Sequence, residues 1–210
     1  MGSQRILTVC GSLGEASANR SLLDVVERVL SQLGVEATTD AQLGALPALR
    51  PELVDAPGTA VTTFRRQIAI ADAVIIAAPE YAGSLAGAVK NALDWVVGSG
   101  ELYGKPVGIL SAGTTGGPFA RQVLARTLVW QGADLVAQLG VATPRTKSDA
   151  AGTLTDEHTI AALEAFTNAV VRSTRATADE RAAISEAVAG SLGVHRHLTS
   201  DSIAIFAGFD

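Results

Sequence analysis

The feature that most constrains the fold is a series of short, largely unbroken apolar runs, each followed by a loop and then by a helix-like segment. Such runs occupy residues 5–10, 73–78 and 106–110. A strand that is apolar on both faces is buried on both faces, which is typical of a parallel sheet between layers of helices. The sequence therefore predicts an α/β protein.

The remaining elements complete an alternation of strands and helices. Two more strands are expected, at 35–39 and 135–141. Helices are expected at 19–33, 60–70, 85–97, 119–131 and 156–173, with a long connection at 43–57. Because no GxGxxG follows the first strand, we predict a three-layer α/β/α sandwich with a flavodoxin-like, five-stranded parallel sheet of order 2-1-3-4-5 rather than a six-stranded dinucleotide fold.

The C-terminal end of the chain does not fit this alternation. We expect one domain over residues 1–175 and a helical or irregular extension over 176–210, whose role the sequence does not indicate. The extension holds His195 and His197. Two histidines at this spacing, with no evident third ligand, indicate solvated polar side chains rather than a metal site.

Composition excludes several classes of protein. Hydrophobic residues make up 48% of the chain and charged residues 18%, which excludes a mostly disordered protein. The net charge of -5 has the wrong sign for a broad nucleic-acid surface. Cys10 is the one cysteine, so internal disulfides are excluded, and the apolar runs are too short to span a membrane. We therefore expect a cytoplasmic protein with no nucleic-acid or membrane partner.

The loop after the first strand, residues 11–20, has the composition of a phosphate site. Gly11 allows a sharp turn, Ser12 and Ser17 offer hydroxyls, and Asn19 and Arg20 add an amide and a positive charge. They stand where the next helix exposes unpaired N–H groups, which favours a phosphate monoester as the ligand. The alternative interpretation is that Ser17 or Asn19 only caps the helix.

Two further loops are expected at the same edge of the sheet. PEYAGS, from Pro79, places Tyr81 among small residues, and SAGTTGG, at 111–117, brings glycine backbone toward the edge. Narrow slots of this kind bind flat ligands, although each loop by itself could be an ordinary turn. Asp40 ends the second strand where a Rossmann fold holds its ribose-binding acid, but the glycine pattern of that fold is missing.

The chain resembles the NADPH-dependent FMN reductases, a family that includes quinone, azo-dye and chromate reductases. The resemblance rests on GSLGEASANR, PEYAGSLAGAVKNALDW and GKPVGILSAGTTGG, and it covers about the first 175 residues. It implies bound FMN, reduced by NADPH or NADH. By resemblance, the phosphate of FMN would bind Ser12, Ser17, Asn19 and Arg20. Its ring would lie between Pro79, Glu80, Tyr81, Ala82 and Gly83 on one side and Ser111, Ala112, Gly113, Thr114, Gly116 and Gly117 on the other.

Two positions depart from the family pattern. Many relatives have arginine in place of Gly14 and asparagine in place of Ala82. The resemblance also implies a homodimer or homotetramer, with the helix that contains Trp95 as a candidate contact, although a tryptophan there is typical of a core. Arg145 and Lys147 are candidates for the 2′-phosphate of NADPH, and a solvated basic patch is the alternative.

In such a reductase the flavin carries out the chemistry, so no catalytic side chain is expected. The expected acceptor is free FMN, a quinone, an azo compound or a metal oxyanion, with ping-pong kinetics. One alternative is a flavodoxin-like electron carrier, which usually shields its flavin with two aromatic residues. Aromatics total 4% here, and Tyr81 is the only one in the three loops. Another alternative is a flavin-binding regulatory protein whose tail covers the site.

Overall fold

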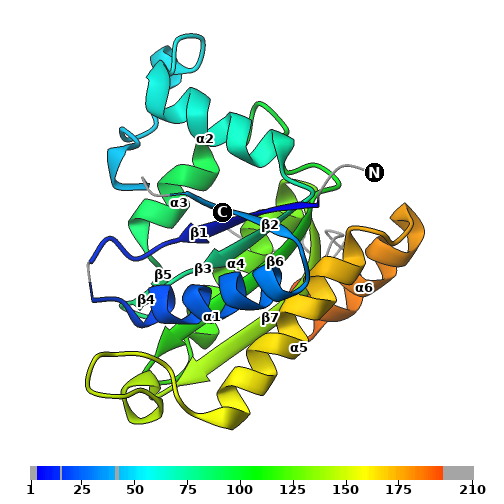
Figure 1. The fold of residues 1–210 in the computed structure, drawn as a ribbon. Coiled ribbons are helices and arrows are strands. Elements are labelled where there is room, and N and C mark those ends of the chain that lie inside the picture. Colours follow the sequence, from blue (N-terminus) through cyan, green and yellow to red (C-terminus); the bar gives the residue numbers. More distant parts are fainter. Residues whose placement is uncertain (1–3, 15, 41–42, 196–210) are drawn as a thin grey trace, which may run out of the picture.

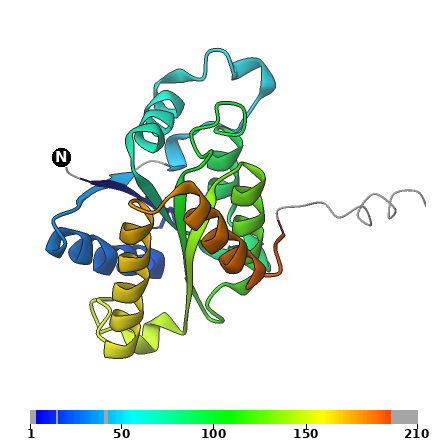
Figure 2. The same ribbon diagram turned by 90° about the vertical axis from the view of Figure 1, so that its right-hand side faces the viewer.

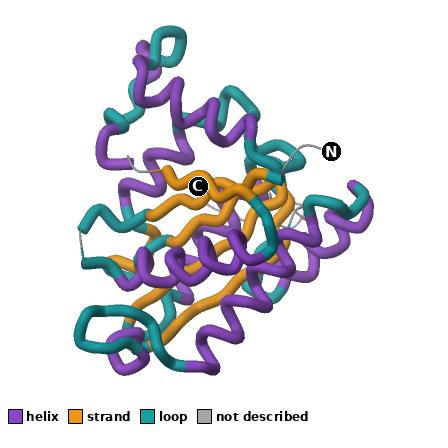
Figure 3. The backbone as a smooth tube through the Cα atoms, viewed as in Figure 1, coloured by secondary structure: helices purple, strands orange, loops and turns teal. Residues whose placement is uncertain are grey.

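The computed structural model describes residues 4–14, 16–40 and 43–195. Its five-stranded sheet has the order β2-β1-β3-β6-β7, and neighbouring strands run parallel throughout (Figures 1 and 3). The strands are β1 Arg5–Cys10, β2 Glu36–Asp40, β3 Ala73–Ala77, β6 Pro106–Gly113 and β7 Asp134–Ala142. In chain order these are the five predicted strands, arranged 2-1-3-4-5. The prediction of a flavodoxin-like α/β/α sandwich is confirmed.

Helices cover both faces of this sheet, as the view along its edge shows (Figure 2). They are α1 Ala18–Gln32, α2 Gly58–Ile70, α3 Gly87–Asp94, α4 Pro118–Trp130, α5 Glu157–Ser173 and α6 Ala178–Gly190. Side chains of α1 and α5 form the core on one face, and those of α2, α3 and α4 form the core on the other. Within the described ranges, no helix combines the length and the apolarity that a membrane span requires.

Successive strand residues supply the two cores in turn. In β1, Ile6 belongs to the core under α1 and α5, whereas Leu7 belongs to the core on the opposite face, and neither is exposed. Ile75 and Ile76 of β3 divide in the same way. This alternation explains why consecutive positions of the central strands are apolar. The apolar runs were therefore a correct guide to the sheet.

A glycine sets the distance between α5 and the sheet. A Cβ on Gly108 of β6 would lie 2.7 Å from both Phe166 and Val170 of α5. The C-terminal half of α5 is thus held directly on β6.

The same helix begins at a cap formed by Asp156, which accepts hydrogen bonds from the hydroxyl and the backbone N–H of Thr159. These two bonds lower the pKa of Asp156.

The segment after β3 differs from the prediction of a plain loop and a helix over 85–97. It first forms a two-stranded antiparallel hairpin, β4 Glu80–Tyr81 and β5 Ser84–Leu85, and the helix α3 then ends at Asp94. Trp95 turns inward and is 1% exposed, and its indole N–H donates to the carbonyl of Pro47 at 2.7 Å. Trp95 is therefore a core residue, and it offers no surface to a partner.

The long connection between β2 and α2 contains two short 3₁₀ helices, η1 Leu43–Ala45 and η2 Pro51–Leu53. Asn91 of α3 ties this connection to the body of the protein. Its side chain donates to the carbonyl of Pro47 at 3.0 Å and accepts from the N–H of Leu49 at 2.9 Å. The part of the connection between the two 3₁₀ helices is thereby fixed through its backbone groups.

The described part of the C-terminal extension packs against β7. Ser185 of α6 is fully buried, and its Oγ accepts a hydrogen bond from the backbone N–H of Leu135 at 2.9 Å. Nearby, Arg181 pairs with Asp134 at 3.1 Å. Both contacts lie where β7 begins, at the end of the sheet opposite the carboxyl edge. Residues 196–210, with His197, lie outside the described residues, so a tail that covers the site remains a prediction.

Candidate functional site

Three loops meet where β1, β3 and β6 end, at the left of the sheet in Figure 1. They are residues 11–17, 78–83 and 114–117. Backbone hydrogen bonds hold the strand ends together: Gly11 donates to Ala77 at 2.7 Å, and Ala78 donates to Leu110 at 2.9 Å. The prediction that these loops share the carboxyl edge of the sheet is confirmed. The third loop is shorter than expected because β6 continues to Gly113 and pairs there with Ala142 of β7.

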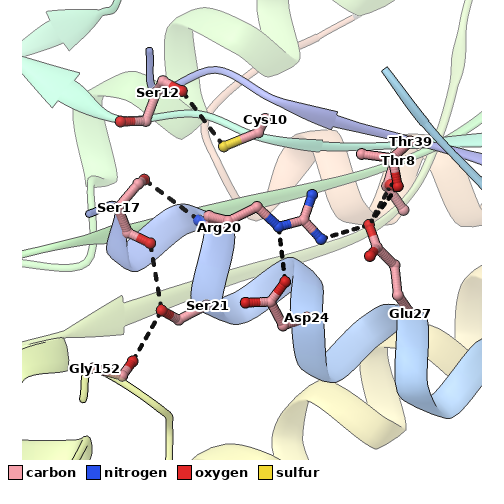
Figure 4. A network of polar contacts seen from close by, with 10 residues as sticks. All are labelled: Thr8, Cys10, Ser12, Ser17, Arg20, Ser21, Asp24, Glu27, Thr39 and Gly152. Atoms are coloured by element: carbon pink, nitrogen blue, oxygen red, sulfur yellow. Dashed lines mark hydrogen bonds and ion pairs between the residues drawn. The ribbon is translucent and has the colours of Figure 1, made fainter. Parts of the chain in front are cut away.

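The first loop leaves β1 in a space that admits only glycine. A Cβ on Gly11 would collide with a methyl group of Val89 on α3. At the other end of the loop, Ser17 caps α1, and its hydroxyl accepts from the N–H of Arg20 at 3.4 Å (Figure 4). Ser12 and Ser17 are both half-buried. Two hydroxyls and the first turn of a helix therefore border this loop, which is a favourable setting for a phosphate.

Asn19 is buried in a contact between α1 and β6. It is 3% exposed, and its side-chain oxygen accepts from the N–H of Ala112 at 2.9 Å while its amide donates to the Ala112 carbonyl at 3.4 Å. The pair of bonds joins α1 to β6. Asn19 thus fixes the first loop relative to the third.

Arg20 points along α1 toward two carboxylates (Figure 4). Its guanidinium pairs with Asp24 at 2.8 Å and with Glu27 at 2.6 Å. Glu27 also accepts from the hydroxyl of Thr8 at 2.6 Å and from that of Thr39 at 3.1 Å. Burial disfavours the charge of Arg20, but the bonds and charges of these carboxylates outweigh it and raise its pKa. Glu27 thus links α1 to β1 and β2, and Arg20 is held beside it on the helix.

The hairpin in the second loop turns at Ala82 and Gly83. Tyr81 pairs with Ser84, and the two residues between them have φ values of 51° and 67°. A two-residue turn with positive φ at both positions is a type I′ turn, for which Asn-Gly is the preferred sequence. Ala82 is one of two described residues other than glycine with positive φ. The geometry of this turn thus favours asparagine over alanine at position 82.

Glu80 reaches from the hairpin to the start of α4. Its carboxylate accepts hydrogen bonds from the N–H groups of Phe119 and Ala120 at 2.8 and 2.9 Å. The N-cap residue of α4, Gly117, has no side chain for this purpose. Glu80 therefore caps α4 from a distance and anchors the hairpin, and sequence reasoning missed this role because the partners are 39 and 40 residues away.

The third loop rests on a buried serine. Ser111 is fully buried, and its hydroxyl donates to the carbonyl of Ala78 at 2.6 Å. Gly117 lies directly above it, so that a Cβ at Gly117 would collide with the Ser111 hydroxyl. Gly116 and Gly117 both have positive φ, 77° and 63°. The glycines are thus required for the path of the loop, whatever its ligand.

Arg121 supports the same loop from below. Its Nε donates to the carbonyl of Gly116 at 3.2 Å, and its guanidinium also contacts the side-chain oxygen of Gln138 on β7. Burial lowers the pKa of Arg121, and the charge of Glu80 opposes this shift. A half-buried cation therefore stands beneath the backbone of the third loop. Neither its position nor its role was predicted from the sequence.

Two aromatic side chains are exposed beside these loops. Tyr81, on the hairpin, is 61% exposed, and Phe119, in the first turn of α4, is 57% exposed. A Cβ on Gly83 would lie 4.0 Å from the ring of Phe119, so this residue stands next to the hairpin tip. Phe119 follows the third loop and was left out of the predicted site. The site therefore has a second aromatic residue, which weakens the sequence argument for an open ring face.

The predicted site residues divide into two groups. Those at least partly exposed at the carboxyl edge are Ser12, Ser17, Arg20, Glu80, Tyr81, Ala82, Gly83, Gly113 and Thr114. Those buried beneath it are Asn19, Pro79, Ser111, Ala112, Gly116 and Gly117. The exposed group can contact a ligand through side chains. The buried side chains shape the loops, so contact from their positions would have to come from the backbone.

The described residues contain no group of three or more His, Cys, Asp and Glu side chains that could hold a metal ion. What the edge does contain is a phosphate setting at the start of α1 and, beside it, glycine-lined backbone with two exposed aromatic rings. A flat ring with a phosphate arm, such as FMN, fits this arrangement. Close approach of glycine backbone to the ring would supply polar contacts without bulky side chains.

Comparison with known proteins agrees with this geometry. The family model of the NADPH-dependent FMN reductases matches residues 4–147. The NAD(P)H-dependent FMN reductase PA1204 of Pseudomonas aeruginosa is 39% identical over 133 residues, which cover 60% of this chain and 70% of that protein. An NADPH:quinone oxidoreductase of Arabidopsis thaliana is 30% identical over 183 residues, which cover 78% of this chain and 91% of that protein.

Solved structures show the same fold. FerB from Paracoccus denitrificans, described as a flavoenzyme NAD(P)H:(acceptor) oxidoreductase, superposes with a TM-score of 0.70 and 27% sequence identity. The match covers 82% of this chain and 97% of FerB. The family match at residues 4–147 spans β1 to β6 and the segment that follows β6. It therefore includes all three loops of the carboxyl edge.

Proposed function

The chain belongs to the NADPH-dependent FMN reductase family, and on that premise we propose that it passes hydride from NADPH through bound FMN to a small acceptor. FMN as cofactor and NAD(P)H as co-substrate are supported by the family and by its relatives. The observation that carries the proposal is the meeting of three loops at one edge, with a helix N-terminus at one end and two exposed aromatic rings at the other.

In the proposed complex the phosphate binds at the first loop. Ser12 and Ser17 donate their hydroxyls, and the first turn of α1 supplies N–H groups. Arg20 has a supporting role in this proposal, since its guanidinium is engaged by Asp24 and Glu27. Asn19 keeps the loop in place through Ala112. In this proposal Ser12 and Ser17 contact the phosphate directly, and Asn19 and Arg20 support them.

The ring is proposed to lie between the hairpin and the third loop. Tyr81 and Phe119 border it with their side chains, and Thr114 and the glycines border it with hydroxyl and backbone groups. When bound, FMN supplies the chemistry of hydride acceptance and delivery. The chain orients the ring and excludes water from part of it. Glu80 and Arg121 hold the two flanking segments in position.

We expect the reductant and the acceptor to use the same exposed ring face in turn. Oxidised nicotinamide then leaves before the acceptor binds, which gives ping-pong kinetics and parallel lines in plots of initial rate; intersecting lines would contradict this order.

The proposed acceptors are free FMN, a quinone, an azo compound or a metal oxyanion, all of which react with an accessible reduced flavin. A homodimer or homotetramer is part of the proposal.

The test is a visible absorption spectrum of the purified protein with FMN, followed by anaerobic addition of NADPH. Loss of the flavin band at about 450 nm would support an FMN-dependent reductase. A bound flavin that neither NADPH nor NADH bleaches would instead favour an electron carrier or a regulatory protein. Absence of FMN binding would contradict the proposal altogether.

A further inference from the structure

A groove of about 600 Å³ lies between α1 and the segment 144–154, and it begins at Ala16 and Ser17, the end of the first loop. In Figure 1 this segment is the yellow-green loop below the start of α1. One wall is the face of α1 from Ser17 to Arg28. The floor is apolar, because Leu22, Val25 and Leu154 are at most 4% exposed. The groove shares Ser17 and Arg20 with the proposed phosphate site and extends away from that site along α1 to Arg28.

Both walls of the groove are held in place by hydrogen bonds. Ser21 of α1 donates its hydroxyl to the carbonyl of Gly152 at 3.0 Å (Figure 4). Within the opposite wall, the carboxylate of Asp149 accepts from the N–H groups of Ala151 and Thr153, both at 2.9 Å. The segment is therefore an ordered wall that is attached directly to α1.

The charges in the groove leave two arginines free. Asp24 is paired with Arg20, and Asp149 is occupied by backbone N–H groups of its own loop. Arg28 and Arg145 also line the groove and are exposed. Neither has a side-chain partner among the residues that the structure describes. The lining of the groove holds three arginines against two aspartates, an excess of one positive charge.

The apolar floor and the two arginines together indicate which kind of ligand the groove would bind. An apolar floor suits a flat heterocycle, and guanidinium groups bind phosphate oxygens through paired, charge-assisted hydrogen bonds. A ring that carries a phosphate close to it satisfies both. Among the co-substrates of the proposed reaction, the adenosine end of NADPH has this chemistry.

The groove also adjoins the proposed flavin site. Ser17 belongs both to the first loop and to the groove wall. On the other side, Thr143 donates its N–H to the carbonyl of Gly113 at 3.0 Å, and the groove residues Pro144 and Arg145 follow it directly. An extended dinucleotide could thus reach from the ring into the groove.

We propose that this groove binds the phosphorylated adenosine end of NADPH, with Arg28 and Arg145 on its 2′-phosphate. The inference rests on the proposed function. It changes the pair of residues that the sequence indicated, Arg145 and Lys147, because Lys147 does not line the groove and its charge acts on Asp156. Arg28 takes the place of Lys147 in the proposed site.

The first test is calorimetric titration of the full-length protein with adenosine 2′-monophosphate, which needs neither FMN nor turnover. Each of Arg28→Gln and Arg145→Gln should weaken binding by about tenfold, the typical value of a lost hydrogen bond to a charged group. Arg126→Gln, an exposed arginine of α4 on the other face of the sheet, is the matched control and should leave binding unchanged. Binding that is absent, or equal in all variants, would overturn the proposal.

The second test identifies the source of the adenosine phosphate. If it is NADPH, both groove variants should raise the KM for NADPH by about tenfold and leave kcat and the KM for NADH nearly unchanged. Arginine-dependent binding of adenosine 2′-monophosphate with an unaltered KM for NADPH would overturn the assignment to NADPH and indicate a separate nucleotide. If NADPH fails to bleach FMN while calorimetry still shows arginine-dependent binding, the proposed function fails and the anion-binding groove stands.

Discussion

At the scale of single residues, the hairpin turn of the candidate site carries backbone strain that one substitution should remove. Ala82 has a φ of 51°, and an L-residue with a Cβ is disfavoured there unless it is asparagine or aspartate. We expect Ala82→Asn to raise the free energy of unfolding by about 0.5–1 kcal/mol. Chemical denaturation checks this. Gly83→Ala, at the neighbouring positive φ, should have the opposite sign, and equal stabilities would contradict the type I′ assignment.

Glu80 provides a second prediction at this scale. Its carboxylate is the cap of α4, so Glu80→Ala should lower the free energy of unfolding by about 1–2 kcal/mol. Glu80→Gln keeps one acceptor oxygen and should lose less. Because the same contact anchors the hairpin, we also expect weaker FMN binding in the alanine variant, measured by quenching of flavin fluorescence. Unchanged stability in the alanine variant would show that the cap is not significant.

At the scale of elements, the described part of the C-terminal extension acts as a cover for β7. Ser185→Ala removes the acceptor for the buried N–H of Leu135 and should cost about 1–3 kcal/mol of unfolding free energy. Ser191, exposed near the end of α6, is the control position, and Ser191→Ala should have a small effect. Thermal unfolding of both variants gives the comparison. Equal melting temperatures would mean that α6 is dispensable for the sheet.

The elements also show what sequence reasoning can and cannot establish. β3 and the first half of β6 were predictable because burial on both faces leaves no polar side chain in Ala73–Ala77 or in residues 106–110. The hairpin was not, because two-residue strands have no periodicity and only a turn signal marks them.

The same limit applies to the site. Its loops were located correctly by their place after the strands, but the partners of individual polar side chains were not. Asn19 and Ser111 find theirs 93 and 33 residues away, and composition holds no information about such distant choices. Groups that face solvent, such as Ser17 and Tyr81, lie where their position in the motif indicates.

At the scale of the whole molecule, a cofactor that binds only the folded chain should stabilise it. FMN at one hundred times its Kd should add about 2.7 kcal/mol to the free energy of unfolding, and its removal by dialysis should reverse the gain. Riboflavin, which lacks the phosphate, is the control and should stabilise less if the first loop binds that group. Differential scanning calorimetry with both compounds is the measurement. Equal stabilisation would place the phosphate outside the loop.

The buried bonds that join the three loops have a thermodynamic consequence. Ser111 with Ala78, Asn19 with Ala112, and Gly11 with Ala77 connect the segments beneath the site without involving its surface. Their geometry is therefore set during folding, and the chain loses little conformational entropy when the cofactor arrives. Affinity can then come from a small number of contacts, and a protein with an exposed, sparsely lined edge can still retain its flavin between successive encounters with different partners.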